Sequence, residues 1–326
     1  MNFTEPYKAL VTGGAGFVGS HLVEALLKRG CPVAIVDNFD DFYPRARKLA
    51  NLEEAARVGK FALHEADIRD FAAMRAVFET ERPEVVIHVA ARAGVGRSVE
   101  QPKIYEEVNV GGTLNLLMLS HDFEVKKFVF ISSSSVYGAT ARVPFVEDHH
   151  ELMPLSPYAA TKIAGELLCY TYSHLHALSV VCLRLFSVYG PRQRPDLALH
   201  VFASHLEAGK PIPIFGDASS ARDYTYVDDV VAGILAAAAC DTSYDVFNIG
   251  NSQPVKLLDL VSVLEKVAGK RGELKSLPPR PGDVPLTWGD ISKARRLLGY
   301  DPQTSLESGV ERFLAWYRRA SRTAAP

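Results

Sequence analysis

A tyrosine and a lysine four residues apart are the side chains in this sequence best suited to proton transfer. Tyr158 and Lys162 stand at the start of the stretch 158–176, whose apolar spacing predicts a helix. Side chains four residues apart share one face of a helix, and a nearby cation lowers the pKa of a phenol. The pair could therefore act as a general base near neutral pH.

Hydroxyl groups reach the same region from the run Ser132–Ser135, which ends an apolar stretch that begins at Phe128. That stretch predicts a buried strand, and ligands of open α/β sheets bind beyond the carboxyl ends of the strands. The serines and the tyrosine are therefore expected at one edge of one sheet.

A glycine-rich turn supplies a second kind of chemistry. Gly13, Gly16 and Gly19 lie where a predicted strand leads into an amphipathic helix, whose first residues are Phe17 and Val18. Such glycines allow a tight turn and a close approach to a pyrophosphate, which the helix N-terminus attracts. Because no Lys-Ser/Thr pair follows, the turn is not a mononucleotide P-loop.

An acid at the end of the second predicted strand specifies the dinucleotide. Asp37, followed by Asn38, lies 18 residues after Gly19, where a carboxylate accepts hydrogen bonds from the adenosine ribose and repels a 2′-phosphate. NAD is therefore predicted rather than NADP. Asp67 and Ile68 could flank the adenine. Asn109 is either part of this cofactor site or an amide satisfied in the core.

Alternating strands and helices must position these residues. Apolar runs at 8–12, 32–36, 61–64, 85–90, 128–132 and 180–186 read as strands buried on both faces. Helical patterns separate them at 17–29, 45–57, the 70s to 79, 104–121 and 158–176, and return later at 227–240, 256–268 and 305–319. We therefore predict an α/β fold, a Rossmann-type doubly wound parallel sheet with a smaller α/β substrate-binding lobe on the C-terminal side. The boundary is expected near 187, with a segment at about 225–250 returning to the first domain and 188–326 forming the lobe.

Composition limits the function further. The 36 Lys+Arg against 38 Asp+Glu among 326 residues leave no basic excess for nucleic acid. The longest small-apolar run, 230–240, is too short for a membrane span, and the N-terminus shows no signal peptide. The four scattered cysteines and ten histidines show no metal spacing. A cytoplasmic enzyme without a metal is expected.

The segments TGGAGFVGSH, SSSSVYG, SPYAATK and ARDYTYVDD, together with Asp37, resemble the extended short-chain dehydrogenases/reductases, and within them the nucleotide-sugar epimerases. The resemblance implies Tyr158 as the base, Lys162 on the nicotinamide ribose and Ser133 on the sugar hydroxyl. Ser133 is chosen because it precedes Gly138 by five residues, with Ser134 and Ser135 as alternatives. It also implies a homodimer formed by the helices at 104–121 and 158–176.

The same segment discriminates between reactions. Dehydratases and decarboxylases of this family carry an acid just before V-Y-G, where this sequence has Ser134 and Ser135. Loss of water needs a proton donor for the leaving hydroxyl, so 4-epimerisation with tightly held NAD is implied. A net NAD-dependent oxidoreductase and a non-catalytic NAD-binding protein are the alternatives.

Further resemblances indicate the substrate. Arg222 and Arg280 match family positions that contact the nucleotide diphosphate, Asp283 is a further candidate for substrate binding, and Phe215 is a candidate to stack on uracil. The segment 37–52 and the run LRLFSVYGPRQRPDLAL resemble UDP-glucuronate 4-epimerases, which implies Ser187 and Arg194 at the sugar carboxylate. Arg192 is an equally placed alternative to Arg194. UDP-glucuronate is the predicted substrate, with UDP-glucose and UDP-N-acetylglucosamine as alternatives.

Overall fold

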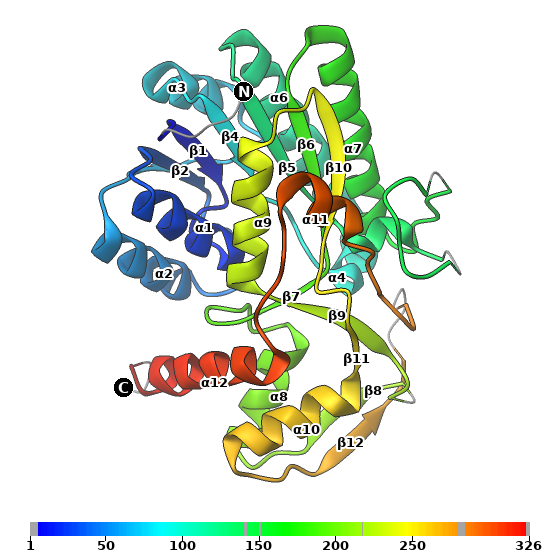
Figure 1. Ribbon diagram of the computed structural model, residues 1–326. Helices are drawn as coiled ribbons and strands as arrows, with labels where there is room; N and C mark the ends of the chain where they lie inside the picture. Colours follow the sequence, from blue (N-terminus) through cyan, green and yellow to red (C-terminus); the bar gives the residue numbers. More distant parts are fainter. Residues whose placement is uncertain (1–5, 140–141, 150, 217, 280–283, 324–326) are drawn as a thin grey trace.

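The apolar runs become strands of one parallel sheet in the computed structural model, which describes residues 6–139, 142–149, 151–216, 218–279 and 284–323 (Figure 1). Within these residues the seven strands lie in the order β10-β6-β5-β4-β1-β2-β3, and every pair is parallel. They are β1 (Ala9–Thr12), β2 (Val33–Asp37), β3 (Ala62–Glu65), β4 (Val85–His88), β5 (Lys127–Ser133), β6 (Val180–Leu185) and β10 (Tyr244–Ile249). The order reverses beside β1, which places a ligand crevice between the ends of β1 and β4.

Helices cover both faces of this sheet. One face carries α1 (Phe17–Lys28), α2 (Arg45–Val58), α9 (Val227–Ala239) and α11 (Ser292–Leu298), and the other carries α3 (Phe71–Glu81), α6 (Gly112–Asp122) and α7 (Pro157–His176). Successive residues of β1 show why its sequence does not alternate, since Val11 packs into the first core and Leu10 into the second. The predicted Rossmann-type sheet is confirmed. None of the helices in the described ranges is long and apolar enough to cross a membrane.

One predicted helix differs from the structure. The range 104–121 was expected to be continuous, but it comprises α5 (Pro102–Glu106), a π-helical segment (Glu107–Gly111) and α6. Gly112 lies so close to Ile68 that a Cβ would sit 2.5 Å from its side chain. The wider π turn lets this helix pass Ile68 while Asn109 turns inward, and such turns occur often at functional sites.

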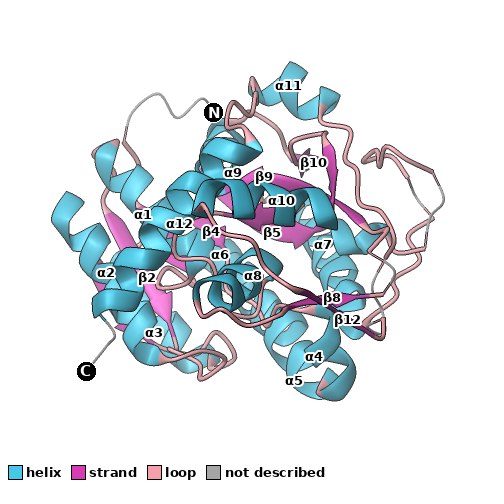
Figure 2. Ribbon diagram, turned by 90° about the horizontal axis from the view of Figure 1, so that it is seen from below, coloured by secondary structure: helices cyan, strands magenta, loops and turns pink. Residues whose placement is uncertain are grey.

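The second lobe lies below the carboxyl edge of the sheet in Figure 1 and in front of it in Figure 2. It contains the sheet β11-β9-β7 (Pro254–Lys256, Ala221–Tyr226, Ser187–Tyr189) and the parallel pair β12-β8 (Leu274–Leu277, Ile212–Phe215). Helices α8 (Ala198–Glu207), α10 (Leu257–Ala268) and α12 (Leu306–Thr323) share a core with them. The short helix α4 (Val95–Glu100) and the 3-10 turn Ser134–Tyr137 complete the elements found in the described residues.

Two segments leave the second half of the chain to join the first sheet. The helix α9 and the strand β10 extend it beside β6. The helix α11 also packs there, since Ile291, Ala294 and Tyr300 belong to the core of the sheet. The sequence did not predict this second returning segment, because a seven-residue helix spans too few turns to show a helical period.

Candidate active site

A large cavity opens at the carboxyl edge of the sheet, facing the second lobe. Its volume is about 1130 Å³, above the roughly 300–1,000 Å³ typical of a pocket for one drug-sized ligand. Sixteen of the predicted site residues line it: Gly13, Gly16, Phe17, Val18, Gly19, Asp37, Asn38, Asp67, Ile68, Ser133, Tyr158, Lys162, Ser187, Arg194, Phe215 and Arg222. Arg280 and Asp283 lie outside the described residues. The cavity is large enough for a cofactor and a substrate together.

The start of α7 brings the reacting side chains to this cavity. Ser156 caps the helix by accepting a hydrogen bond from the amide of Ala159 at 3.2 Å, and a proline occupies the first helical position. Tyr158 therefore lies in the first turn and Lys162 one turn later on the same face. Strand β5 ends beside them at Ser133, whose hydroxyl is hydrogen-bonded to that of Tyr158. The structure thus brings together the three residues predicted to react.

Burial dominates the proton affinities of this group. It raises the pKa of Tyr158, against smaller lowering effects of the Ser133 hydrogen bond and the charge of Arg194. It lowers the pKa of Lys162 to about 8, and the Lys162 ammonium donates to the carbonyl of Ile131 at 2.7 Å. The sequence argument made Lys162 the group that lowers the tyrosine's pKa. The structure gives that role to Ser133 and Arg194, because the ammonium is turned toward the backbone of β5.

A buried ion pair fixes the elements behind these residues. Arg184 on β6 donates to both carboxylate oxygens of Glu166 on α7, at 3.0 and 2.8 Å, and Ser132 donates to the same carboxylate at 2.5 Å. All three side chains are buried. Sequence reasoning missed Glu166, although its spacing of four residues from Lys162 on one helix face was a usable signal.

The glycine turn has the geometry that a pyrophosphate needs. Gly13 has φ +71°, and a Cβ there would lie 2.8 Å from the amide nitrogen of Ala90. A Cβ on Gly19 would lie 2.1 Å from the carbonyl oxygen of Gly13. No side chain caps the N-terminus of helix α1. The amides of its first turn are therefore left available to a ligand in the cavity. The cradle fits the pyrophosphate of NAD.

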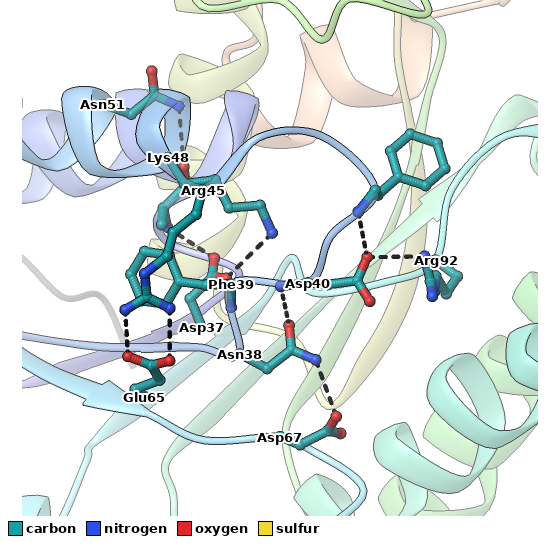
Figure 3. A network of polar contacts seen from close by, with 12 residues as sticks. Asp37, Asn38, Phe39, Asp40, Arg45, Lys48, Asn51, Glu65, Asp67 and Arg92 are labelled. Atoms are coloured by element: carbon teal, nitrogen blue, oxygen red, sulfur yellow. Dashed lines mark hydrogen bonds and ion pairs between the residues drawn. The ribbon is translucent and has the colours of Figure 1, made fainter.

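Asp37 lies against the glycine turn, and Figure 3 shows it among its polar neighbours. Its buried carboxylate accepts hydrogen bonds from the amides of Ala15 at 3.1 Å and Phe39 at 2.9 Å, and Lys48 lies 3.7 Å away. The next residue, Asn38, donates to Asp67 at 3.0 Å. Asp37 is thus held rigidly at the cavity wall, where its acceptor oxygens suit the ribose hydroxyls of NAD.

Asn109 does not line the cavity; it holds one of its walls. Its Oδ1 accepts from the amide of Arg92 at 2.8 Å, and its Nδ2 donates to the carbonyl of Arg92 and to Thr161, each at 3.0 Å. Of the two roles considered from sequence, the satisfied core amide is the one that the structure displays. Asn109 joins the loop after β4 to the first turns of α7, the helix of Tyr158.

The structure separates the two alternative arginines. Arg192 lies 2.7 Å from Glu24 on α1 and is not among the residues that line the cavity. Arg194 lines the cavity and binds Asp196 through Nε at 3.0 Å and Nη2 at 2.9 Å. Only Arg194 is placed to meet a ligand.

The second lobe supplies the far wall. Ser187 on β7 pairs with Tyr224 on the adjacent strand β9, which also carries Arg222. Arg222 donates to the carbonyl oxygens of Ala221 at 3.0 Å and Pro285 at 3.3 Å, which anchors one side of its guanidinium. Together with Phe215 at the end of β8, these residues form a polar and aromatic part of the cavity wall.

Sequence reasoning also missed a loop cluster on the cavity. Arg92 and Arg97 line it from the segment after β4, and Phe42 lines it from the segment after β2. Arg92 donates to Asp40 at 2.8 Å, which joins the two segments (Figure 3). Their position directly after buried parallel strands was the signal that could have identified them.

Comparison with known proteins agrees with this geometry. The family model described as GDP-mannose 4,6 dehydratase matches residues 10–313. The chain belongs to this family, the extended short-chain dehydrogenases/reductases, and the resemblance seen in the sequence is confirmed.

Individual relatives are more specific. The chain is 44% identical to a UDP-glucuronate 4-epimerase of Thermodesulfobacterium geofontis, over 94% of this chain and 95% of that one. The structure is similar to UDP-glucuronic acid 4-epimerase from Bacillus cereus in complex with UDP-glucuronic acid and NAD, with TM-score 0.90, 38% identity and coverage of 96% and 99%. It is equally similar to UDP-glucose 4-epimerase from Thermotoga maritima with UDP-glucose, with TM-score 0.90, 35% identity and the same coverage.

Proposed function

We propose that this chain is an NAD-dependent UDP-sugar 4-epimerase that interconverts UDP-glucuronate and UDP-galacturonate. The observation that carries the proposal is the hydrogen-bonded pair Ser133–Tyr158 in a cavity that also contains Asp37 and Arg194. Asp37 and the glycine turn would hold the cofactor, and Arg194 and Ser187 would hold the sugar. The named relatives act on the same class of substrate.

The chain's own part in the reaction is to move one proton and to hold the sugar. Bound NAD supplies the hydride acceptor and donor at C4. Tyr158 takes the proton of the 4-hydroxyl and returns it, while Ser133 keeps the hydroxyl of Tyr158 in place and reduces the cost of its ionisation. Lys162 is carried over from the family as the contact to the nicotinamide ribose. Inversion requires the sugar to present its other face to the cofactor within the cavity.

A uronic acid makes a further demand on the site. Oxidation at C4 turns the sugar into a β-keto acid, which loses carbon dioxide readily. We assign Ser187 and Arg194 to fix the carboxylate out of alignment with the ring carbonyl and so suppress this loss. Asp196, which holds two of the N–H groups of Arg194, keeps the guanidinium at one orientation.

Dehydration, the reaction in the description of the matching family, is disfavoured by the residues after β5. Ser134 and Ser135 stand where an acid would protonate the leaving hydroxyl, and Ser135 instead bonds to Ser133, with 3.1 Å between the two hydroxyl oxygens. Neutral UDP-sugars remain the second candidate substrates, because a UDP-glucose epimerase is equally similar in structure.

Proton NMR of the anomeric region tests the proposal. Purified protein is incubated with UDP-glucuronate, UDP-glucose or UDP-N-acetylglucosamine in separate tubes without added NAD. A UDP-galacturonate signal without any UDP-pentose is expected. Conversion of the neutral sugars alone would remove the carboxylate role of Arg194 and leave the 4-epimerase chemistry, whereas no conversion in any tube would favour a net oxidoreductase that needs added cofactor.

We also propose the organisation around this site: residues 1–187 with the returning segment bind NAD, and the lobe within 188–326 binds the nucleotide sugar. Large apolar side chains are exposed on the neighbouring helices α6 and α7, namely Met118, Leu167, Tyr170 and Leu175. Their exposure supports a homodimer through these helices. The four free cysteines support a reducing, cytoplasmic location.

A further inference from the structure

Two arginines share one aromatic ring at the cavity. The guanidinium carbon of Arg97 lies 3.9 Å from the centre of the Phe42 ring, and that of Arg194 lies 4.9 Å from it. All three side chains line the cavity, although they come from three separate segments of the chain. Stacking on a ring restrains a long side chain, so Phe42 holds both cations at one place on the cavity wall.

This place lies near the reacting tyrosine. The ring of Tyr105 meets that of Tyr158 edge-on, with 6.2 Å between their centres. Burial raises the pKa of Tyr105, and the charges of Arg194, Arg92 and Arg97 act in the opposite direction. The charge of Arg194 also reaches Tyr158 itself. The charges of the three arginines therefore act on Tyr105, beside Tyr158, and that of Arg194 on Tyr158 as well.

The charges in this cluster are not balanced. Asp40 neutralises Arg92 at 2.8 Å, and Asp196 neutralises Arg194 through two N–H groups. Arg97 is exposed, and no carboxylate in the described part of the chain lies within 4 Å of its guanidinium. One positive charge is left over beside the sugar position, and its natural partner is an anion brought by the substrate.

We propose that Arg97 is a specificity-determining residue, whose guanidinium, stacked on Phe42 beside Arg194, binds the carboxylate of a uronic acid. The inference rests on the proposed function and adds to it the group that favours a charged sugar over a neutral one. Arg194 has two of its N–H groups committed to Asp196, so it cannot present its full fork. A second guanidinium completes the recognition of a carboxylate, for which arginine is well suited.

The diphosphate is the competing anion, and the cluster's position argues against it. Arg222 and Phe215 line the cavity from the second lobe, whereas Arg97 comes from the segment after β4 and belongs to the group whose charges act on Tyr105. A residue that binds the diphosphate would bind charged and neutral UDP-sugars alike. A residue that binds the sugar carboxylate distinguishes them, and this difference is measurable.

Calorimetric titration of the holoenzyme measures this difference in binding between charged and neutral UDP-sugars. UDP-glucuronate, UDP-glucose and UDP are titrated into wild-type protein, Arg97→Gln and Arg82→Gln. Arg82 is a matched control, because it is also an exposed arginine stacked on a phenylalanine, 4.9 Å from the ring of Phe123, and does not line the cavity. In Arg97→Gln we expect about tenfold weaker binding of UDP-glucuronate and less than about twofold change for UDP-glucose and UDP.

Every outcome decides between the alternatives. Equal loss of all three ligands in Arg97→Gln assigns the residue to the diphosphate and overturns the proposal, as does unchanged binding of UDP-glucuronate. Arg97→Lys keeps the charge and should recover part of the affinity, and Phe42→Leu should lose part of it. If wild-type protein converts only neutral sugars, the proposed substrate fails and the role of Arg97 with it. If wild-type protein converts UDP-glucuronate and Arg97→Gln is as selective, only the role of Arg97 fails.

Discussion

Replacing Ser133 with alanine tests how Tyr158 is made basic. Burial raises the pKa of Tyr158, and Ser133 is the first of the two groups that lower it, ahead of Arg194. Tyrosinate is the form that accepts a proton, so loss of the Ser133 hydroxyl disfavours the reactive state. A hydrogen bond to a charged group is worth about 1.5–3 kcal/mol, and about 1.4 kcal/mol is a factor of ten. At neutral pH the variant should therefore lose about 10- to 100-fold in kcat/KM.

The sign of the effect determines how the rate depends on pH. Because burial already raises the pKa of Tyr158 and Ser133→Ala raises it further, both proteins lie on the rising limb of the kcat/KM profile up to about pH 10. The rate should therefore rise with pH in both, and the deficit should persist across this range. Lys162, whose pKa is lowered to about 8, loses its proton over the same range in both proteins. The effect of Lys162 therefore cancels in the ratio of kcat/KM between the variant and the wild type.

The assay is the rate of epimer formation by anomeric proton NMR, measured from about pH 6 to about pH 10. Ser133→Thr keeps a hydroxyl at the same place and should restore most of the rate. A rate that Ser133→Thr does not restore would refute the reasoning, because the loss in Ser133→Ala would then not come from the missing hydroxyl.

Other predictions concern cofactor retention, stability and assembly. Asp40→Asn removes the ion pair with Arg92 that joins the two cavity segments, so labelled NAD should leave about fivefold faster on dilution into unlabelled NAD. Asp41→Asn, at an exposed neighbour, is the control, and equal rates in both would contradict the idea. Glu166→Gln leaves a buried arginine without its carboxylate and should lower the free energy of unfolding in urea by about 3–5 kcal/mol; a change below about 1 kcal/mol would show that the pair is dispensable. Leu167→Glu puts a charge on an exposed apolar residue of α7 and should shift the sedimentation of the protein from dimer toward monomer, and an unchanged profile would speak against this interface.

The positions of the glycine turn and of the Tyr158–Lys162 pair in the fold could be predicted from the sequence because each depends on local spacing. Gly13 and Gly19 belong to one strand–turn–helix motif, and Tyr158 and Lys162 are one helical turn apart. The geometry within each pair follows once the strand and the helices are assigned. The confirmed parallel sheet places these two local patterns at one edge. No long-range information beyond the alternation of strands and helices was needed.

The loop cluster could not be predicted in this way. Phe42 and Arg194 come from irregular segments and Arg97 from the six-residue helix α4, which is too short to show a readable period, and their contact depends on how these three segments fold over one another. The sequence also named the wrong cation as the one that lowers the pKa of Tyr158, for the same reason. Spacing along α7 indicated Lys162 as the nearby cation, but only the fold shows that its ammonium binds Ile131 and that Arg194 approaches from another lobe.

This contrast separates the chemistry of the site from its choice of substrate. Ser133 and Tyr158 sit on β5 and α7, which the buried contacts of Glu166 tie together, so a change there alters the reaction for every sugar. Arg97 sits exposed on the short helix α4, with a charge that the described protein leaves unbalanced. Its loss should alter selectivity and leave the stability and the turnover of neutral sugars unchanged. The two kinds of residue are therefore distinguishable by whether a substitution acts on all substrates or on the charged one alone.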